Sequence, residues 1–149
     1  MIGIEDITDA VVSHSQRLGI FDRVNEHEPK AAPGQGLWCA IWADRINPAK
    51  SGLASTTIRA IFTVRLGTNM VQEPQDMIDR NLIGALDLLM GAYSGDFTLD
   101  GLIRNVDLLG QEGIPLQAQA GYLQQDQSVF RIFDISLPLL VNDVWEQVP

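Results

Sequence analysis

The feature that most constrains the fold is an alternation of apolar and mostly polar residues within the run from Ser55 to Leu66. Successive side chains of a β-strand point to opposite faces of a sheet, so this alternation predicts a strand with one face in a core. The polar positions of the run include Arg59 and Arg65, which we expect to face away from the core and to be exposed. The apolar positions are Ile58, Ala60, Phe62, Val64 and Leu66.

Two segments have the spacing of amphipathic helices. From Ile4 to Leu18, apolar residues recur at steps of three and four, and Gly19 follows where a helix commonly ends. The second segment, about Pro74 to Ala92, opens with a proline and two acids, as first helical turns often do. We expect this second helix to pack across the sheet through Ile78, Leu82, Ala85, Leu86, Leu89 and Tyr93.

Five further strands are predicted, because runs of β-forming residues are separated by Gly, Pro, Asn and Asp. A loop is expected from Pro29 to Gly36, and a connector from Lys50 to Ser55 makes the flanking strands a hairpin. Pro138 indicates that the last strand is an edge strand or bends there. The five strands are Ile20 to Val24, Leu37 to Ile46, Leu102 to Leu109, Leu116 to Gln125 and Ser128 to Leu139.

The order of these elements is helix, three strands, helix, three strands. Such runs of strands favour antiparallel connections, so we predict an α+β fold with two layers, a mainly antiparallel sheet packed against two helices. The chain has 149 residues, 46% of them hydrophobic and 19% charged, which is typical of one folded domain over residues 1–149. A chain of this size can bury a core without a metal or a disulfide.

Charge and cysteine content exclude several classes of protein. The formal net charge of −9 repels phosphate and argues against tight nucleic-acid binding. The single cysteine, Cys39, cannot form an internal disulfide, which suits a reducing cytoplasm. The N-terminus carries Glu5 and Asp6 where a signal peptide would carry Lys or Arg, and the apolar runs are short, so we expect a soluble protein without a membrane segment.

The histidines and the cysteine have structural interpretations. In Glu26-His27-Glu28, neighbouring side chains of an extended segment point to alternating sides, which favours a solvated segment over a metal site. His14 lies on or beside the apolar face of the first helix, so we expect a structural histidine rather than a general base. Cys39 lies in an apolar strand, where burial raises the pKa of a thiol and makes it inert.

The glycines and the acidic residues do not form a recognisable phosphate-binding or calcium-binding pattern either. Gly34 and Gly36 are not followed by Lys-Ser/Thr or by a helix, which favours a surface loop over a phosphate-binding site. The spacing of Asp96, Asp100 and Asp107 is too irregular for a calcium loop, so we expect turn and solvent-face acids. The sequence therefore predicts no catalytic, metal-binding or cofactor-binding residue, and a protein that is not an enzyme.

Two strand faces are candidates for contact with other chains. Trp38 and Trp42 share a strand face, which favours core packing over an exposed aromatic patch for a partner. Gln117, Gln119 and Gln125 also share one face, which fits a subunit contact or a solvated surface equally well.

Several segments together resemble the tail terminator proteins of long-tailed, non-contractile (siphovirus-type) bacteriophages. The likeness begins at Leu18 to Gly34, LGIFDRVNEHEPKAAPG, and continues with the strand Leu37 to Ile46 and Pro48. It also includes the alternating strand, the mid-chain helix and the closing segment Phe130 to Val141, FRIFDISLPLLV. These segments follow one another in the order found in such proteins and cover most of the chain.

The resemblance implies a structural α/β subunit rather than an enzyme. Such subunits form a homo-oligomeric ring, a hexamer, at the head-proximal end of the tail tube; the ring stops tube growth and presents the surface that joins the head. The implied partners are further copies of the chain, the tail tube protein and a head–tail connector or neck protein. The implied locations are the virion and, during assembly, the host cytoplasm, and DNA passes through the ring without specific binding.

A ring closes through heterologous contacts, in which one patch of each subunit meets a different patch of the next. The candidate contact residues are Arg59, Arg65, Gln117, Gln119 and Gln125, together with the segments Pro29 to Gly36 and Lys50 to Ser55. If the two arginines are exposed, charge reversal at either should impair oligomerisation more than folding.

Three alternatives remain open at this level. The chain could be another ring component of the phage neck, such as a tail-completion or head-closure protein. It could be a small cytoplasmic enzyme whose site forms at a subunit interface from His14, His27 or scattered acids. It could also be an adaptor that pairs an open sheet edge with a partner strand.

Overall fold

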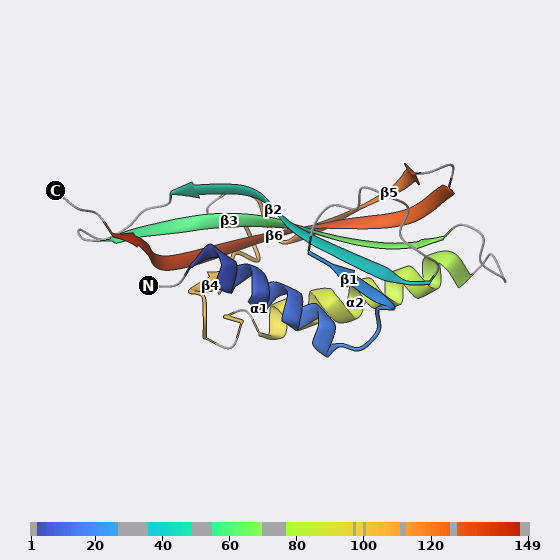
Figure 1. Cartoon of the computed structure of the whole chain (residues 1–149), viewed down its shortest axis with the longest axis horizontal. Helices are drawn as coiled ribbons and strands as arrows, with labels where there is room; N and C mark the ends of the chain where they lie inside the picture. The colour runs from blue at the N-terminus through green and yellow to red at the C-terminus, as the bar shows by residue number, and fades with distance from the viewer. Residues whose placement is uncertain are drawn as a thin grey trace.

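The computed structural model describes residues 3–26, 36–48, 55–69, 77–96, 98–99, 101–110, 113–125 and 128–146. Within them, two helices lie on one side of a single, mostly antiparallel sheet (Figure 1), which is the α+β fold expected from the sequence. In chain order the elements are α1 (Ile4–Arg17), β1 (Arg23–Asn25), β2 (Trp38–Pro48), β3 (Ser55–Asn69), α2 (Met77–Gly95), β4 (Asn105–Val106), β5 (Gln117–Gln125) and β6 (Ser128–Glu146).

The sheet is built around its two longest strands. β3 and β6 run antiparallel from the pair Asn69–Phe130 to the pair Ser55–Glu146. The predicted hairpin is confirmed, because β2 pairs antiparallel with the other edge of β3. β1 adds to β2 in parallel, and β4 and β5 both pair with the free edge of β6, one after the other. The sheet therefore ends in β1 and β2 on one side and in β4 and β5 on the other.

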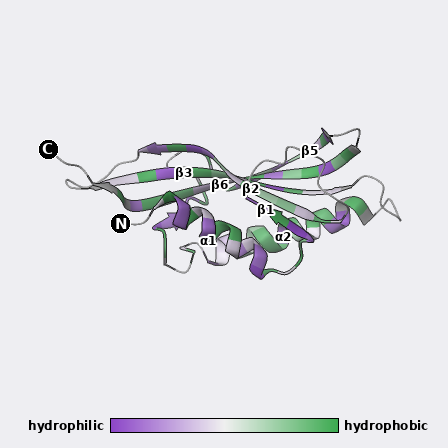
Figure 2. Ribbon diagram, viewed as in Figure 1, coloured by the Kyte–Doolittle hydropathy of each residue, from purple (hydrophilic) through white to green (hydrophobic). Residues whose placement is uncertain are grey.

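One face of the sheet, here called the helix face, carries the core. All five apolar positions of the alternating run are fully buried there, as predicted. β6 contributes Ile135, Leu137, Leu139 and Val141 to the same cluster, and the helices close it from below in the view of Figure 1. Colouring by hydropathy shows hydrophilic and hydrophobic segments alternating along α1, whereas most of α2 is hydrophobic (Figure 2). The opposite surface of the sheet, here called the open face, has no helix over it among the residues that the structure describes.

Each helix buries the residues that its periodicity predicts. In α1, Ile7 and Val11 are fully buried, and Asp6 caps the helix start by accepting a hydrogen bond from the Gly3 N–H at 3.1 Å. Gly19 has φ +64°, the left-handed conformation expected after a helix. In α2 the predicted face is confirmed, with Leu82, Ala85, Leu89 and Tyr93 among its buried residues. The proposed start at Pro74 lies outside the described residues.

Two strands are shorter than predicted, and the last strand is longer, since β6 runs beyond Leu139 to Glu146. The strand expected over Leu102 to Leu109 is only β4, because Leu99, Gly101 and Gly110 have positive φ and the chain turns around them. The strand expected over Ile20 to Val24 is β1, which begins only at Arg23. Ile20 and Phe21 instead pack as irregular chain against the core.

Pro138 neither marks an edge strand nor ends β6, which continues to Glu146 between two neighbours. Its carbonyl accepts a hydrogen bond from the Asp107 N–H at 2.9 Å. The carbonyl and the nitrogen of one strand residue face the same side. The missing N–H therefore faces the position where the neighbour of β6 changes from β5 to β4. The first residue of β5, Gln117, lies opposite Ser136, and the last residue of β4, Val106, lies opposite Leu139. A proline is tolerated there because no ladder hydrogen bond is lost.

Candidate subunit interface

The open face holds a second, smaller apolar cluster. Its buried members are Trp38, Ala40, Phe130 and Ile132, with Trp42 and Leu123 packed against them. Trp38 meets Phe130 edge to face, with the ring centroids 5.9 Å apart. A Cβ atom at Gly67 would come within 2.3 Å of the Trp38 ring, so glycine is required there. The core interpretation of Trp38 is confirmed, and this part of the open face is already filled by its own side chains.

Arg65 is held within its own subunit. Its Nε and Nη2 donate hydrogen bonds to the two carboxylate oxygens of Asp134, at 2.7 and 3.1 Å. The guanidinium also lies 5.1 Å from the ring centroid of Trp42. Only 14% of the Arg65 side chain is exposed. Arg65 faces away from the main core as predicted, but the expectation that it is exposed was wrong, because a neighbouring strand supplies its acid.

Arg59 is also half-buried rather than exposed. Its Nη2 donates a hydrogen bond to the carbonyl of Ile114 at 3.2 Å, and its guanidinium lies against Gly113 in the segment before β5. Gly113 has φ +139°, and an added Cβ would meet the guanidinium at 2.6 Å. Arg59 therefore fastens this segment to the open face, a role that depends on residues far away in the sequence.

The glutamines of β5 differ from the two arginines in their exposure. Gln117 and Gln119 are exposed on the open face. Gln119 and Arg65 lie in register on either side of Asp134, so one row across the sheet contains both predicted contact types. Gln125 ends β5, and only its backbone is described. Of the two candidate segments, residues 29–35 and 50–54 lie outside the described residues.

The outer backbone edge of β5 has no partner strand within the described residues. Carbonyls of Pro138 and Leu140 face β4, so even-numbered residues of β6 direct their backbone groups to this side of the sheet. They are in register with the odd-numbered residues of β5. By alternation, the N–H and C=O groups that point away from the sheet belong to Ala118, Ala120, Tyr122 and Gln124. These four residues alternate along β5 and have no partner strand among the described residues, although the Ala120 carbonyl accepts a hydrogen bond from the Gln119 side chain at 3.5 Å.

The opposite edge, on β2, is different. β1 covers it at Trp38 to Ala40. Beyond that point the pairing with β3 shifts between Ala43 and Arg45, the signature of a bulge. Asp44 and Arg45 are exposed there, and Pro48 falls at an outward position without an N–H to offer. This edge is interrupted, charged and poorly suited to accept another strand.

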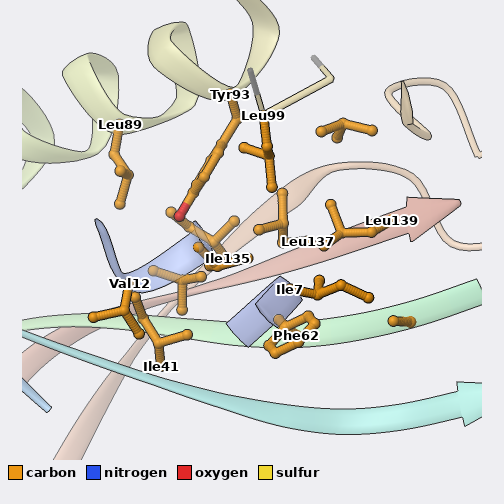
Figure 3. Close-up of a cluster of buried hydrophobic side chains, with 14 of the residues drawn as sticks. Ile7, Val12, Ile41, Phe62, Leu89, Tyr93, Leu99, Ile135, Leu137 and Leu139 are labelled. Carbon is orange, nitrogen blue, oxygen red and sulfur yellow. The ribbon is translucent and has the colours of Figure 1, made fainter. Parts of the chain in front are cut away.

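The residues with the most reactive side chains pack together between α1, α2 and β2. The rings of His14 and Tyr93 stack 5.1 Å apart, and His14 Nδ1 lies 3.8 Å from an Asp96 carboxylate oxygen. In Figure 3, Tyr93 reaches from α2 into the apolar cluster, with its hydroxyl near Ile135. That hydroxyl has no hydrogen-bond partner in the described part of the protein.

Burial sets the acid–base behaviour of this group. It raises the pKa of the Cys39 thiol to about 12, although a hydrogen bond with Ser15 lowers it somewhat. It also raises the pKa of Tyr93 well above its usual range, and the nearby Cys39 charge adds to this effect. Both groups are neutral at pH 7, so the predicted inertness of Cys39 agrees with its position.

The other candidates give no site. Asp107 is buried, so the prediction of a solvent-face acid was wrong for this residue. Glu26 is exposed, whereas His27, Glu28 and Asp100 fall outside the described residues. Across the part of the chain that the structure describes, no three His, Cys, Asp or Glu side chains are grouped to hold a metal ion. Over the same part, neither helix combines the length and the apolar character needed to cross a membrane.

Sequence reasoning missed two surfaces. One is the free edge of β5, because the order of strands in a sheet is not visible in local periodicity. The other is the outer surface of α2, where Ile83 and Leu88 are 51% and 53% exposed. Both residues depart from the apolar face predicted for this helix, and that departure was an available signal. Comparison with protein-family models and with curated proteins found no match to this sequence.

Proposed function

We propose that this chain is a phage tail terminator, a structural subunit that caps the head-proximal end of the tail tube as a ring. In this role it stops polymerisation of the tube protein and provides the surface to which the head joins. The observation that carries the proposal is the agreement between the fold and the resemblance. The resemblance implies a small α/β subunit, and the chain has two helices on one mostly antiparallel sheet, in the expected order.

The use of the polar side chains supports a structural role. Arg65 and Asp134 bind each other, Arg59 fastens a loop, and His14 packs on Tyr93. These contacts stabilise the subunit and occupy groups that could otherwise have served chemistry. His14 is one of the two histidines named for the interface-enzyme alternative. It is buried within the subunit, so it does not lie on a surface where subunits would meet.

Ring closure requires two dissimilar surfaces on each subunit. The first surface is the outer side of α2, where the apolar residues Ile83 and Leu88 are half exposed. It lies on the side of the sheet that the helices cover. The open face presents Gln117 and Gln119 on the opposite side of the sheet. We propose these two surfaces as the contacts of a hexameric ring. Each subunit adds a formal charge of −9, and acids lining the channel would keep passing DNA from adhering.

The test is the length distribution of tubes assembled from the cognate tail tube protein, measured by negative-stain electron microscopy. With this chain present, we expect tubes that stop growing and carry a ring at one end. Unchanged lengths and bare ends would contradict the terminator function. A ring found on the head's connector instead would identify another neck component, which is the alternative closest in size and charge.

A matched pair of variants tests the ring contact. Leu88→Asp places a charge at the margin of the α2 surface and should abolish ring formation without unfolding the subunit, since Leu88 is half exposed. Asp87→Asn, at the neighbouring exposed position, is the control and should terminate tubes normally. Equal termination by both variants would remove α2 from the proposed contact.

A further inference from the structure

Within the described residues, the free edge of β5 has none of the charges, prolines or bulges that normally prevent strand addition. Protected edges carry charges, prolines or bulges, or are very short. β5 has nine residues, Gln117–Gln125, with no charged residue or proline among them, and its pairing with β6 has no register shift. Its neutral side chains and four outward-facing residues form a template for another strand, in which the Ala120 carbonyl accepts only a long hydrogen bond, 3.5 Å, from the exposed Gln119 side chain.

Among the described residues, no contact explains why position 121, at the centre of β5, is a glycine. A Cβ atom there would meet only Ile132, at 3.7 and 3.9 Å, which is ordinary van der Waals contact. Its φ is not among the positive values of the chain. Glycine within a strand weakens it, and it often marks a place where another backbone approaches closely. The missing side chain therefore indicates a neighbour outside the subunit.

We propose that β5 pairs antiparallel with β5 of a second copy, about a two-fold axis at Gly121. In this register the outward-facing residues meet one another, Ala118 opposite Gln124 and Ala120 opposite Tyr122, so all four exchange backbone hydrogen bonds. The residues between them also match across the axis. Gly121 lies opposite itself, Gln119 opposite Leu123, and Gln117 opposite Gln125.

The sequence of β5 fits its own reverse. No like charges face each other, and the large ring of Tyr122 lies beside a small alanine. Tyr122 is 66% exposed in the single subunit and would be covered in part by the pairing. β2 is a poor alternative partner, because its bulge and Pro48 interrupt the ladder. A second β5 is thus the strand that this edge accepts best.

The inference concerns the free subunit and does not rest on the proposed function. A two-fold contact closes at two copies, so it protects a reactive edge from open-ended strand addition. A single six-fold ring has no such two-fold axis within its layer. The dimer is therefore a form of the unassembled protein that ring assembly would have to open.

The first test is the molar mass of the full chain, measured by size-exclusion chromatography with light scattering over a dilution series. We expect a dimer of twice 16.4 kDa that dissociates on dilution. Ala120→Pro removes one outward N–H without touching the β6 ladder and should shift dissociation to at least tenfold higher concentration. Ala120→Ser keeps the N–H and is the matched control. Circular dichroism and a thermal melt establish that each variant is folded.

The second test fixes the register. Residues directly opposite each other in a non-hydrogen-bonded antiparallel pair can form a disulfide. Gly121→Cys should give a covalent dimer on mild oxidation, whereas Gln119→Cys, two residues away, should give much less. Cys39 is buried and leaves the background low.

Three results would overturn the inference. They are a monomer at every concentration, a dimer unaffected by Ala120→Pro in a folded variant, and equal crosslinking at the two cysteine positions. A monomer that instead binds strands of the tail tube protein would point to the adaptor interpretation. The dimer is measured on the isolated chain, without tail tube protein. Failure of this inference can therefore be distinguished from failure of tube termination.

Discussion

The two edges of the sheet differ in how they are protected against the addition of another strand. The β2 edge is covered by β1 for three residues and is then broken by a bulge, two exposed charges and Pro48. The β5 edge has nine neutral residues in unbroken register with β6. Unpaired strand edges invite association, so proteins normally block them. Among the described residues, one edge is blocked, whereas the other is not, and this contrast is the basis for the proposed pairing through β5.

The difference extends to stability. The β2 side is anchored by Trp38, which is buried against Gly67 and Phe130, and by the contact of Trp42 with Arg65. β5 contributes an exposed Tyr122, held by a cation–π contact with Arg131 at 4.6 Å. Burial determines how much a side chain stabilises a fold. The β2 side therefore contributes more buried aromatic surface to the fold than β5 does.

The largest expected effect comes from truncating one aromatic residue on each side. Trp38→Ala should lower the free energy of unfolding by about 3–5 kcal/mol, because it empties the open-face cluster. Tyr122→Ala should change it by less than about 0.5 kcal/mol, since the ring is mostly exposed. Urea denaturation measured at a concentration where the protein is monomeric compares them. Similar losses for both variants would show that the two edges are equally anchored.

Arg65→Met should lower the free energy of unfolding by about 1.5–3 kcal/mol. It removes two hydrogen bonds to a charged group and leaves Asp134, which is only 34% exposed, without its partner. Arg45→Met, on the exposed part of β2, is the control and should have almost no effect. This expectation replaces the sequence-based one that charge reversal at Arg65 acts mainly on oligomerisation, because its premise of an exposed arginine was wrong.

Stability should also fall at alkaline pH through Cys39, which lies in the part of β2 that β1 covers. The thiol pKa is about 12 in the folded protein and about 9.0 when unfolded, so between these values only the unfolded chain releases the proton. The contribution of Cys39 to the free energy of unfolding should be constant below pH 9 and then decrease by about 1.4 kcal/mol per pH unit. Chemical denaturation between pH 8 and 10 tests this, and Cys39→Ala should flatten the profile.

The smallest effect on folding is expected from removing the protection of β2. Arg45→Thr combined with Pro48→Val restores an outward N–H and removes an edge charge, and it should leave stability within about 0.5 kcal/mol. Association should increase, however, because the second edge becomes a template. Light scattering should detect species larger than the dimer. Unchanged association would mean that the bulge at Ala43 and Arg45 protects the edge by itself.

The sequence determined the elements that depend on local pattern. Alternation from Ser55 to Leu66 placed five apolar side chains on the helix face, and the three- and four-residue steps identified the buried faces of both helices. The burial of Cys39 and Trp38 also followed from their apolar neighbours. These predictions succeed because side-chain direction is set by backbone periods that extend over only a few residues.

The tertiary structure alone decided which strands are neighbours and which lie at an edge. Asp134 lies 69 positions from Arg65 along the chain, so no local pattern could show that this arginine is paired. β4 and β5 share one edge of β6, and that arrangement both tolerates Pro138 and leaves the outer edge of β5 without a partner strand among the described residues. Strand order results from long-range packing of the whole chain, and periodicity carries no information about it. The side chains at the edges were therefore readable from the sequence, but the identity of the open edge was not.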